Sequence, residues 1–229
     1  MIASVHVADV GKRAALGVLR KAPSPESVPG LRSANVALTA PLSASVMPKP
    51  DIGRAGLAAF WDDDASLDGF LADHPTADAL ADGWRLRLAP LRMHGSWPGV
   101  PDDLPKQRQI EHAGPAAVLT LGRVRANRAV SFFRASAKAE GAVVGAPGLI
   151  WATGLAKPPF VATCSLWEST DALSEYAYSG HTPEHPGAIA ADHAHPFHHQ
   201  SAFIRFRPYG SVGSLDGRNP LAESWMARV

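Results

Sequence analysis

The sequence holds a single cysteine, Cys164, among its 229 residues. An intramolecular disulfide is therefore excluded, and so is a Cys-x-x-Cys motif. The net charge is only +1, which gives no reason to expect a nucleic acid or an anionic membrane as a partner. No apolar run approaches the roughly 20 residues that a membrane-spanning helix needs. A Gly-rich phosphate loop and a Ser-His-Asp spacing are also missing, so the enzyme classes that use them receive no support.

The first residues enter an alternating, strand-like pattern without a basic segment followed by an apolar one. Because a secretory signal peptide has both segments, we expect none, and we expect a cytoplasmic protein. The broad apolar content of 46% is enough for a sizeable core. The length allows one large domain or two small ones.

An internal repeat is the main feature of the sequence. Short segments of the first half recur in the second half in the same order, which is unlikely to be chance. The matched segments are residues 3–10 with 117–124, 13–20 with 127–134, 28–31 with 146–149, 58–62 with 164–168, 86–91 with 204–209, and 95–99 with 213–217.

Each copy shows the pattern of two helices and four strands. Residues 5–10 and 118–124 are short, aliphatic and partly alternating, which predicts strands. Residues 13–20 and 127–134 have apolar residues at helical spacing and predict helices with Leu16, Leu19, Val130 and Phe133 facing inward. Pro-Gly pairs then mark turns into a second strand.

The rest of each copy continues this order. Third strands should end at Trp61 and Trp167, and both tryptophans should pack in the core. Second helices should follow, with Asp63 or Asp64 and Ser169 or Thr170 as N-caps. Residues 86–91 and 203–209 predict the fourth strands.

The resulting β-α-β-β-α-β order is that of a ferredoxin-like unit. Such a four-stranded antiparallel sheet has helices on one face and leaves the other face bare. Two sheets in one chain can bury their bare faces against each other. We therefore predict an α+β fold in which tandem ferredoxin-like repeats form an intramolecular dimeric α+β barrel. Residues 1–100 would be the first repeat, 101–114 a linker, and 115–229 the second repeat, which carries the site.

The two copies differ most between the second helix and the last strand. The second copy has an extra stretch there, residues 179–199, that holds six of the ten histidines. These are His181, His185, His193, His195, His198 and His199. The asymmetry favours one functional site per chain, built on the second repeat.

These histidines allow several interpretations. They can form a solvated surface loop without function, and His198 and His199 can simply lead into the last strand. A zinc site from His193, His195 and His199 has an unspecific spacing and no cysteine nearby. His185 precedes Pro186, which suits the first turn of a helix, and an apolar surround follows it. An axial haem ligand needs an imidazole of this kind, but periodicity alone does not select haem over a structural histidine.

From residue 114 to residue 221 the sequence resembles the spheroidene monooxygenase family, the bacterial carotenoid 2-ketolases. The likeness extends into the first half at residues 92–99 and at the approach to Trp61. The residues that carry it in the second half are 114–120, Phe132, Phe133, 165–169, 176–178, His185, 202–206, 213–217 and 219–221.

The resemblance implies a haem-containing enzyme that uses oxygen or peroxide and acts on an apolar small molecule. It agrees with the predicted barrel, since haem proteins of the aldoxime dehydratase and chlorite dismutase types use related barrels. The family histidine before the last helix matches His185, which would be the axial ligand of haem b. His181, Tyr178 and Arg205 are further candidates for binding the cofactor, and no catalytic residue is assigned. The protein would be a monomer or a homodimer.

Other functions remain open from the residues alone. A cofactor-independent monooxygenase of the antibiotic-biosynthesis type would use His181 or His185 as a base. A haem dehydratase would use the same site without net oxidation. A non-enzymatic protein that binds haem or a small ligand would share the fold, because a fold does not fix a function. The segment after His185 also departs from the family pattern, at His195–Phe197 and Gln200–Ser201, which leaves the substrate open.

Overall fold

The computed structural model describes residues 1–43, 49–107, 111–178 and 197–221. The first half holds β1 (Ile2–Asp9), α1 (Gly11–Arg20), β2 (Leu31–Ala40), β3 (Asp51–Trp61), α2 (Asp64–Asp73), α3 (Pro75–Ala79) and β4 (Trp84–Gly95). The second half holds β5 (Ala116–Val124), a short 3-10 turn (Ala126–Arg128), α4 (Ala129–Val144), β6 (Leu149–Lys157), β7 (Phe160–Trp167), α5 (Thr170–Tyr178) and β8 (His198–Val212).

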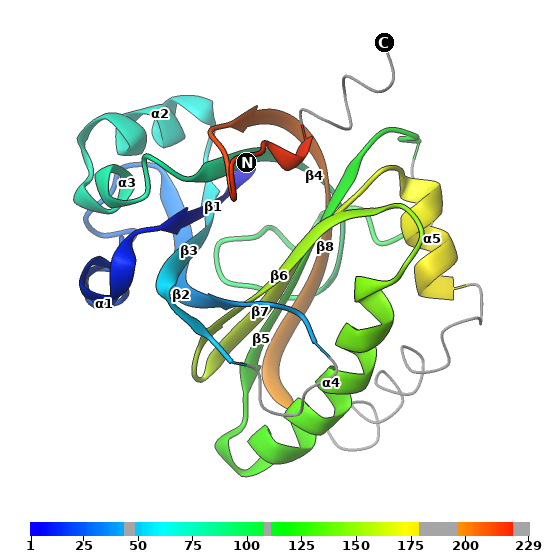
Figure 1. Cartoon of the computed structure of the whole chain (residues 1–229). Helices are drawn as coiled ribbons and strands as arrows, with labels where there is room; N and C mark the ends of the chain where they lie inside the picture. Colours follow the sequence, from blue (N-terminus) through cyan, green and yellow to red (C-terminus); the bar gives the residue numbers. More distant parts are fainter. Residues whose placement is uncertain (44–48, 108–110, 179–196, 222–229) are drawn as a thin grey trace.

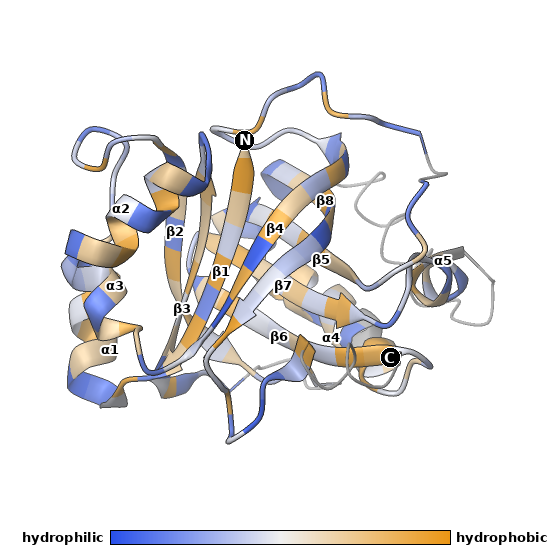
Figure 2. Ribbon diagram, turned by 90° about the horizontal axis from the view of Figure 1, so that it is seen from above, coloured by the Kyte–Doolittle hydropathy of each residue, from blue (hydrophilic) through white to orange (hydrophobic). Residues whose placement is uncertain are grey.

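The eight strands close into one antiparallel barrel in the order β1-β3-β2-β6-β7-β5-β8-β4 (Figure 1). Helices α1, α2 and α3 cover the outer face of the first half, and α4 and α5 lie against the second half (Figure 2). Each half contributes the strand order of a ferredoxin-like unit. The predicted α+β barrel within one chain is therefore confirmed.

The repeat is visible in the turns as well as in the strands. Gly30 and Gly148 both have a positive φ, 71° and 77°, and both carbonyls accept a hydrogen bond of 2.8 Å from the residue after the strand-ending tryptophan. A Cβ on Gly148 would lie 2.5 Å from the Cβ of Ala172. Glycine suits such a position because it has no side chain. The same need for a positive φ therefore explains both Pro-Gly turns.

The barrel interior is filled by its own side chains. Inward residues of all eight strands form one buried apolar cluster. Trp97 follows β4 and Leu215 follows β8, and both join this cluster. Because β4 and β8 are antiparallel neighbours, these repeat-equivalent side chains close opposite ends of the barrel. Cys164 also points into this cluster, and burial raises the pKa of its thiol to about 12, so it is a small core residue as expected.

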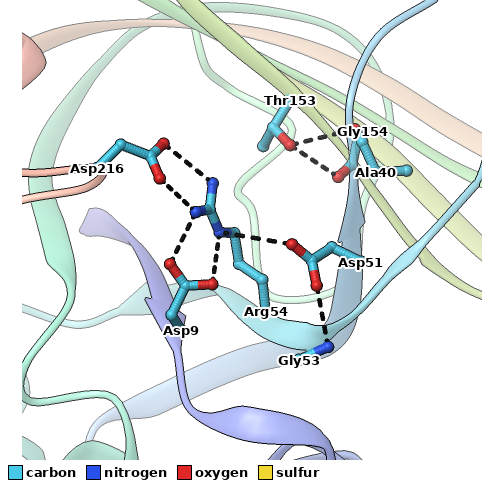
Figure 3. Close-up of polar contacts among 8 residues, drawn as sticks. All are labelled: Asp9, Ala40, Asp51, Gly53, Arg54, Thr153, Gly154 and Asp216. Atoms are coloured by element: carbon cyan, nitrogen blue, oxygen red, sulfur yellow. Dashed lines mark hydrogen bonds and ion pairs between the residues drawn. The ribbon is translucent and has the colours of Figure 1, made fainter.

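The two halves meet along two seams of unequal length. Strands β4 and β8 pair from Arg85 to Gly95, whereas β2 and β6 pair at three positions only. Side-chain contacts outside the strand pairing also connect the two halves (Figure 3). The guanidinium of Arg54 on β3 binds Asp9 at 2.7 Å and Asp216, in the turn after β8, at 2.6 Å.

The predicted inward faces of the first helices are partly wrong. Leu16 is 51% exposed and Val130 is 64% exposed. On α1 the buried residues are Ala15 and Val18, with Leu19 packed beside them. The helix packs on β3 through the stripe at i, i+3 and i+4 that begins at Ala15 rather than Leu16.

The segment between the halves does more than connect them. Val100 is buried, Leu104 packs partly against the core, and the carbonyl of Pro105 accepts a hydrogen bond from the backbone N–H of Met93 at 3.0 Å. The repeat boundaries at 100 and 114 stay a prediction.

Candidate functional site

The outer face of the first repeat is sealed. Leu57, Trp61, Leu67 and Phe70 belong to a buried cluster that runs from β1 to the end of α3. Even its polar atoms are used internally, since the indole N–H of Trp61 donates to Ser4 Oγ at 2.9 Å. Among the described residues this side therefore offers a ligand no apolar surface between sheet and helices.

One hollow on this side, of about 540 Å³, lies beside α2. Two of its polar groups already cap helices. Asp63 accepts a hydrogen bond from the backbone N–H of Ser66, and His74 Nδ1 accepts one from that of Thr76.

The outer face of the second repeat is different. Only Ala116, Trp167, Leu173 and Tyr176 form a buried cluster there among the described residues. The register also places several small side chains on this face, because they alternate with the inward residues. They are Thr120 and Gly122 on β5, Ala152 and Gly154 on β6, and Thr163 and Ser165 on β7. Phe203 of β8, on the same face, is 41% exposed.

Arg205, a predicted cofactor-binding residue, lies on this face. It pairs in register with Val118 on β5 and with Arg92 on β4, and its Nη1 donates to the hydroxyl of Ser174 on α5 at 3.4 Å. Arg92 was not singled out from the sequence. If side chains alternated regularly along β4 from Arg87, Arg92 would face the barrel interior. A bulge between Pro90 and Arg92 shifts the register, so Arg92 lies on the outer face with Arg205.

The other predicted ligands are only partly located. His181 and His185 lie outside the described residues, as do His193 and His195. Tyr178 ends α5. The expectation that His185 is the axial ligand therefore stays a prediction.

Two of the loop's histidines are described. His199 is exposed, as expected, whereas His198 is half-buried. The ring of His198 meets the edge of Phe132 on α4, with centroids 5.1 Å apart, and lies directly against Gly122. From the sequence, His198 was expected to be solvated. The glycine at position 122, which leaves room for the imidazole ring, was the signal that could have predicted its burial.

Glu140 is a second group that the sequence did not single out. It lies on α4, on the same helical face as the buried Ala137. Its carboxylate accepts a hydrogen bond from the backbone N–H of Ser43 at 3.4 Å, but burial raises the pKa of this carboxyl. Within the described segments, no group of three or more His, Cys, Asp and Glu residues could hold a metal ion.

The chain is 29% identical over 176 residues to the spheroidene monooxygenase of Rubrivivax gelatinosus, covering 74% of this chain. It is also 29% identical over 188 residues to the spheroidene monooxygenase of Rhodobacter capsulatus, covering 79% of this chain. The chain is thus similar to spheroidene monooxygenases over most of its length. The predicted resemblance is thus confirmed.

The match spans 66% of the Rubrivivax protein and 77% of the Rhodobacter protein. No protein-family model matches the chain. Among solved structures, an aldoxime dehydratase has a TM-score of 0.54 at 11% identity, covering 96% of this chain and 86% of that one. That likeness supports the fold alone. None of the described helices is long and apolar enough to cross a membrane.

Proposed function

We propose that this chain is a haem-dependent, monooxygenase-like enzyme that acts on an apolar small molecule, with His185 as the axial ligand of haem b. The observation that carries the proposal is the similarity to spheroidene monooxygenases over most of the chain. The name of these relatives gives spheroidene, and we infer a substrate of comparable apolar character. Oxygen or peroxide would be the second substrate.

The described residues fit such a group on the second repeat. Haem b is a flat apolar ring with two carboxylates on one edge. Small side chains line the outer face of the sheet, and Phe203 offers exposed aromatic surface beside them. Arg205 supplies a cation on the same face. In the described part of the first repeat, an apolar cluster fills the layer between the sheet and the helices.

Each residue would have a defined task. His185 would hold the iron, with His181 and Tyr178 close by in sequence. Arg205 would hold a carboxylate of the cofactor. Phe132 and Phe203 would exclude water and contact the apolar substrate. The bound haem would supply the oxidation chemistry, while the protein supplies position and a dry environment.

The test is a visible absorption spectrum of the full chain expressed with added haem. Wild type should show a Soret band that is lost or shifted in His185→Ala. His198→Ala is the matched control, because its imidazole lies on the same face of the sheet. A band that changes only in His198→Ala would move the ligand to β8.

Two further outcomes decide the class of protein. No band in any variant would contradict the haem proposal and favour the cofactor-independent monooxygenase. A band without turnover of an apolar substrate, under oxygen or peroxide, would favour a haem-binding protein that is not an enzyme.

A further inference from the structure

The two ends of the barrel are related by the internal repeat but carry different side chains. Asp9 ends β1 and lies opposite Arg54 of β3. In the second copy the equivalent pair is Arg123, near the end of β5, and Phe160 of β7. One end of the barrel therefore pairs an acid with a cation, whereas the other sets a cation beside an aromatic ring.

The first of these ends neutralises its cation internally. The guanidinium of Arg54 forms ion pairs with Asp9 at 2.7 Å and with Asp216 at 2.6 Å (Figure 3). Asp216 belongs to the turn after β8, and the equivalent turn after β4 has Pro98 at this position. Both acids of the first end are thus replaced in the second, Asp9 by Arg123 and Asp216 by a proline.

Arg123 points into its end of the barrel. It follows Leu119 and Leu121 at alternate positions of β5, and both leucines belong to the buried cluster of the interior. The carbon of its guanidinium lies 5.5 Å from the centroid of the Trp97 ring. Trp97 is 3% exposed and packs against Phe160, with ring centroids 5.9 Å apart. We call the group of Trp97, Arg123 and Phe160 the Trp97 end of the barrel.

Two hydrogen-bond donors at the Trp97 end lack an acceptor. Nε1 of Trp97 and Nε of Arg123 are buried, and neither makes a hydrogen bond within the described part of the chain. The ring of Trp97 attracts the cation, but this contact gives neither donor an acceptor. A buried donor without an acceptor destabilises a fold, and more so when it is charged. The Trp97 end therefore calls for an acceptor that the described residues do not supply.

A carboxylate fits these donors better than a water molecule does. Water accepts hydrogen bonds but brings no charge to replace that of the missing acids. A carboxylate forms charge-assisted hydrogen bonds with a guanidinium and has a second oxygen for an indole N–H. Gln200 of β8 lies directly opposite Arg123 and is neutral. Arg123 as a whole is only half-buried, so solvent reaches this end of the barrel.

We propose that the Trp97 end of the barrel binds a small carboxylate anion, with Arg123 and Trp97 as its hydrogen-bond donors. The anion takes the part that Asp9 and Asp216 play at the other end. This site lies at the mouth of the barrel interior, whereas the proposed haem lies on the outer face of the second sheet. Either proposal can therefore fail without the other.

The test measures binding of acetate, which carries one carboxylate and no other polar group, to the ¹⁵N-labelled full chain. Each of the six tryptophans gives one indole N–H resonance, and Trp97→Phe identifies that of Trp97. In wild type this resonance should shift saturably with sodium acetate and not with sodium chloride at equal ionic strength. Arg123→Met should weaken acetate binding at least about tenfold. Arg207→Met, the same change at an exposed position of β8, is the control and should bind acetate as wild type does.

Gln200→Glu is a second variant that keeps the arginine. It places a carboxylate directly opposite Arg123, so the protein should unfold at a temperature at least as high as wild type. The acetate-dependent shift should disappear because the site is filled. A wild-type resonance that does not respond to acetate, or that responds equally to chloride, overturns the proposal. A shift that persists in both Arg123→Met and Gln200→Glu also overturns it, and if Arg123→Met does not fold, persistence in Gln200→Glu alone is enough.

Discussion

Acidification from pH 7 to pH 5 should destabilise the protein by about 2 kcal/mol through His6 alone. His6 lies on the outer face of β1, almost fully buried, with its Nε2 3.1 Å from Ser4 Oγ. The ring of Phe70 meets it edge-on at 6.3 Å. Burial, followed by the charges of Arg85 and Arg87, lowers the pKa of His6 from 6.5 to about 3.

The sign of the effect follows from these values. The folded state keeps His6 neutral down to about pH 3, whereas the unfolded chain takes up the proton below pH 6.5. A lowered pKa therefore contributes stability that is present above pH 6.5 and is lost as the pH falls toward 3. Each pH unit inside this window is worth about 1.4 kcal/mol, and most of the step from pH 7 to pH 5 lies inside it.

The perturbation is His6→Gln, which keeps a polar group near Ser4 but removes the titration. Urea unfolding at several pH values gives the free energy of unfolding of wild type and variant. The difference between them should change by about 2 kcal/mol between pH 7 and pH 5, with the variant losing less. His199→Gln, at an exposed position of β8, is the control and should follow wild type. Parallel curves for wild type and His6→Gln would refute the argument.

Three further predictions concern the scaffold and α4. Arg54→Ala should cost about 1 kcal/mol or less, because its acidic partners are half exposed, and the loss should shrink in 1 M salt in urea unfolding; a loss independent of salt would contradict an ion-pair origin. Gly148→Ala should cost about 1–3 kcal/mol, since it adds both strain at positive φ and a clash with Ala172, while Gly145→Ala meets open space and should be tolerated. Because burial raises the pKa of Glu140, Glu140→Gln should raise the unfolding temperature at pH 8 and leave it unchanged near pH 4; an equal effect at both pH values would exclude this cause.

The sequence predicted the strands and their order because each local pattern occurs twice. The strand-ending Trp61 and Trp167, the N-capping Asp63 and the Pro-Gly turns all lie where the repeat placed them. The faces of the first helices were harder to predict. Residues 13–20 allow two apolar stripes one residue apart, and only packing against β3 selects the one through Ala15.

The candidate site was less predictable for a related reason. The sequence singled out Arg205 as a candidate for binding the cofactor. Its neighbour Arg92 depends on a bulge in β4, which changes the side of the sheet on which a residue lies. The position of His198 depends on its contact with Gly122, and the two residues lie on neighbouring strands that are far apart in the sequence.

Fusion of the two barrel halves into one chain has an evolutionary consequence. In a barrel made by two identical subunits, every substitution appears on both sheets, so a change that opens space for a ligand weakens the fold twice. In this chain the same change appears once. One sheet–helix layer can accumulate stabilising residues while its counterpart accepts glycines, small polar side chains and half-exposed aromatics. The division of labour between the copies is therefore open to selection in a way that a symmetric assembly does not allow.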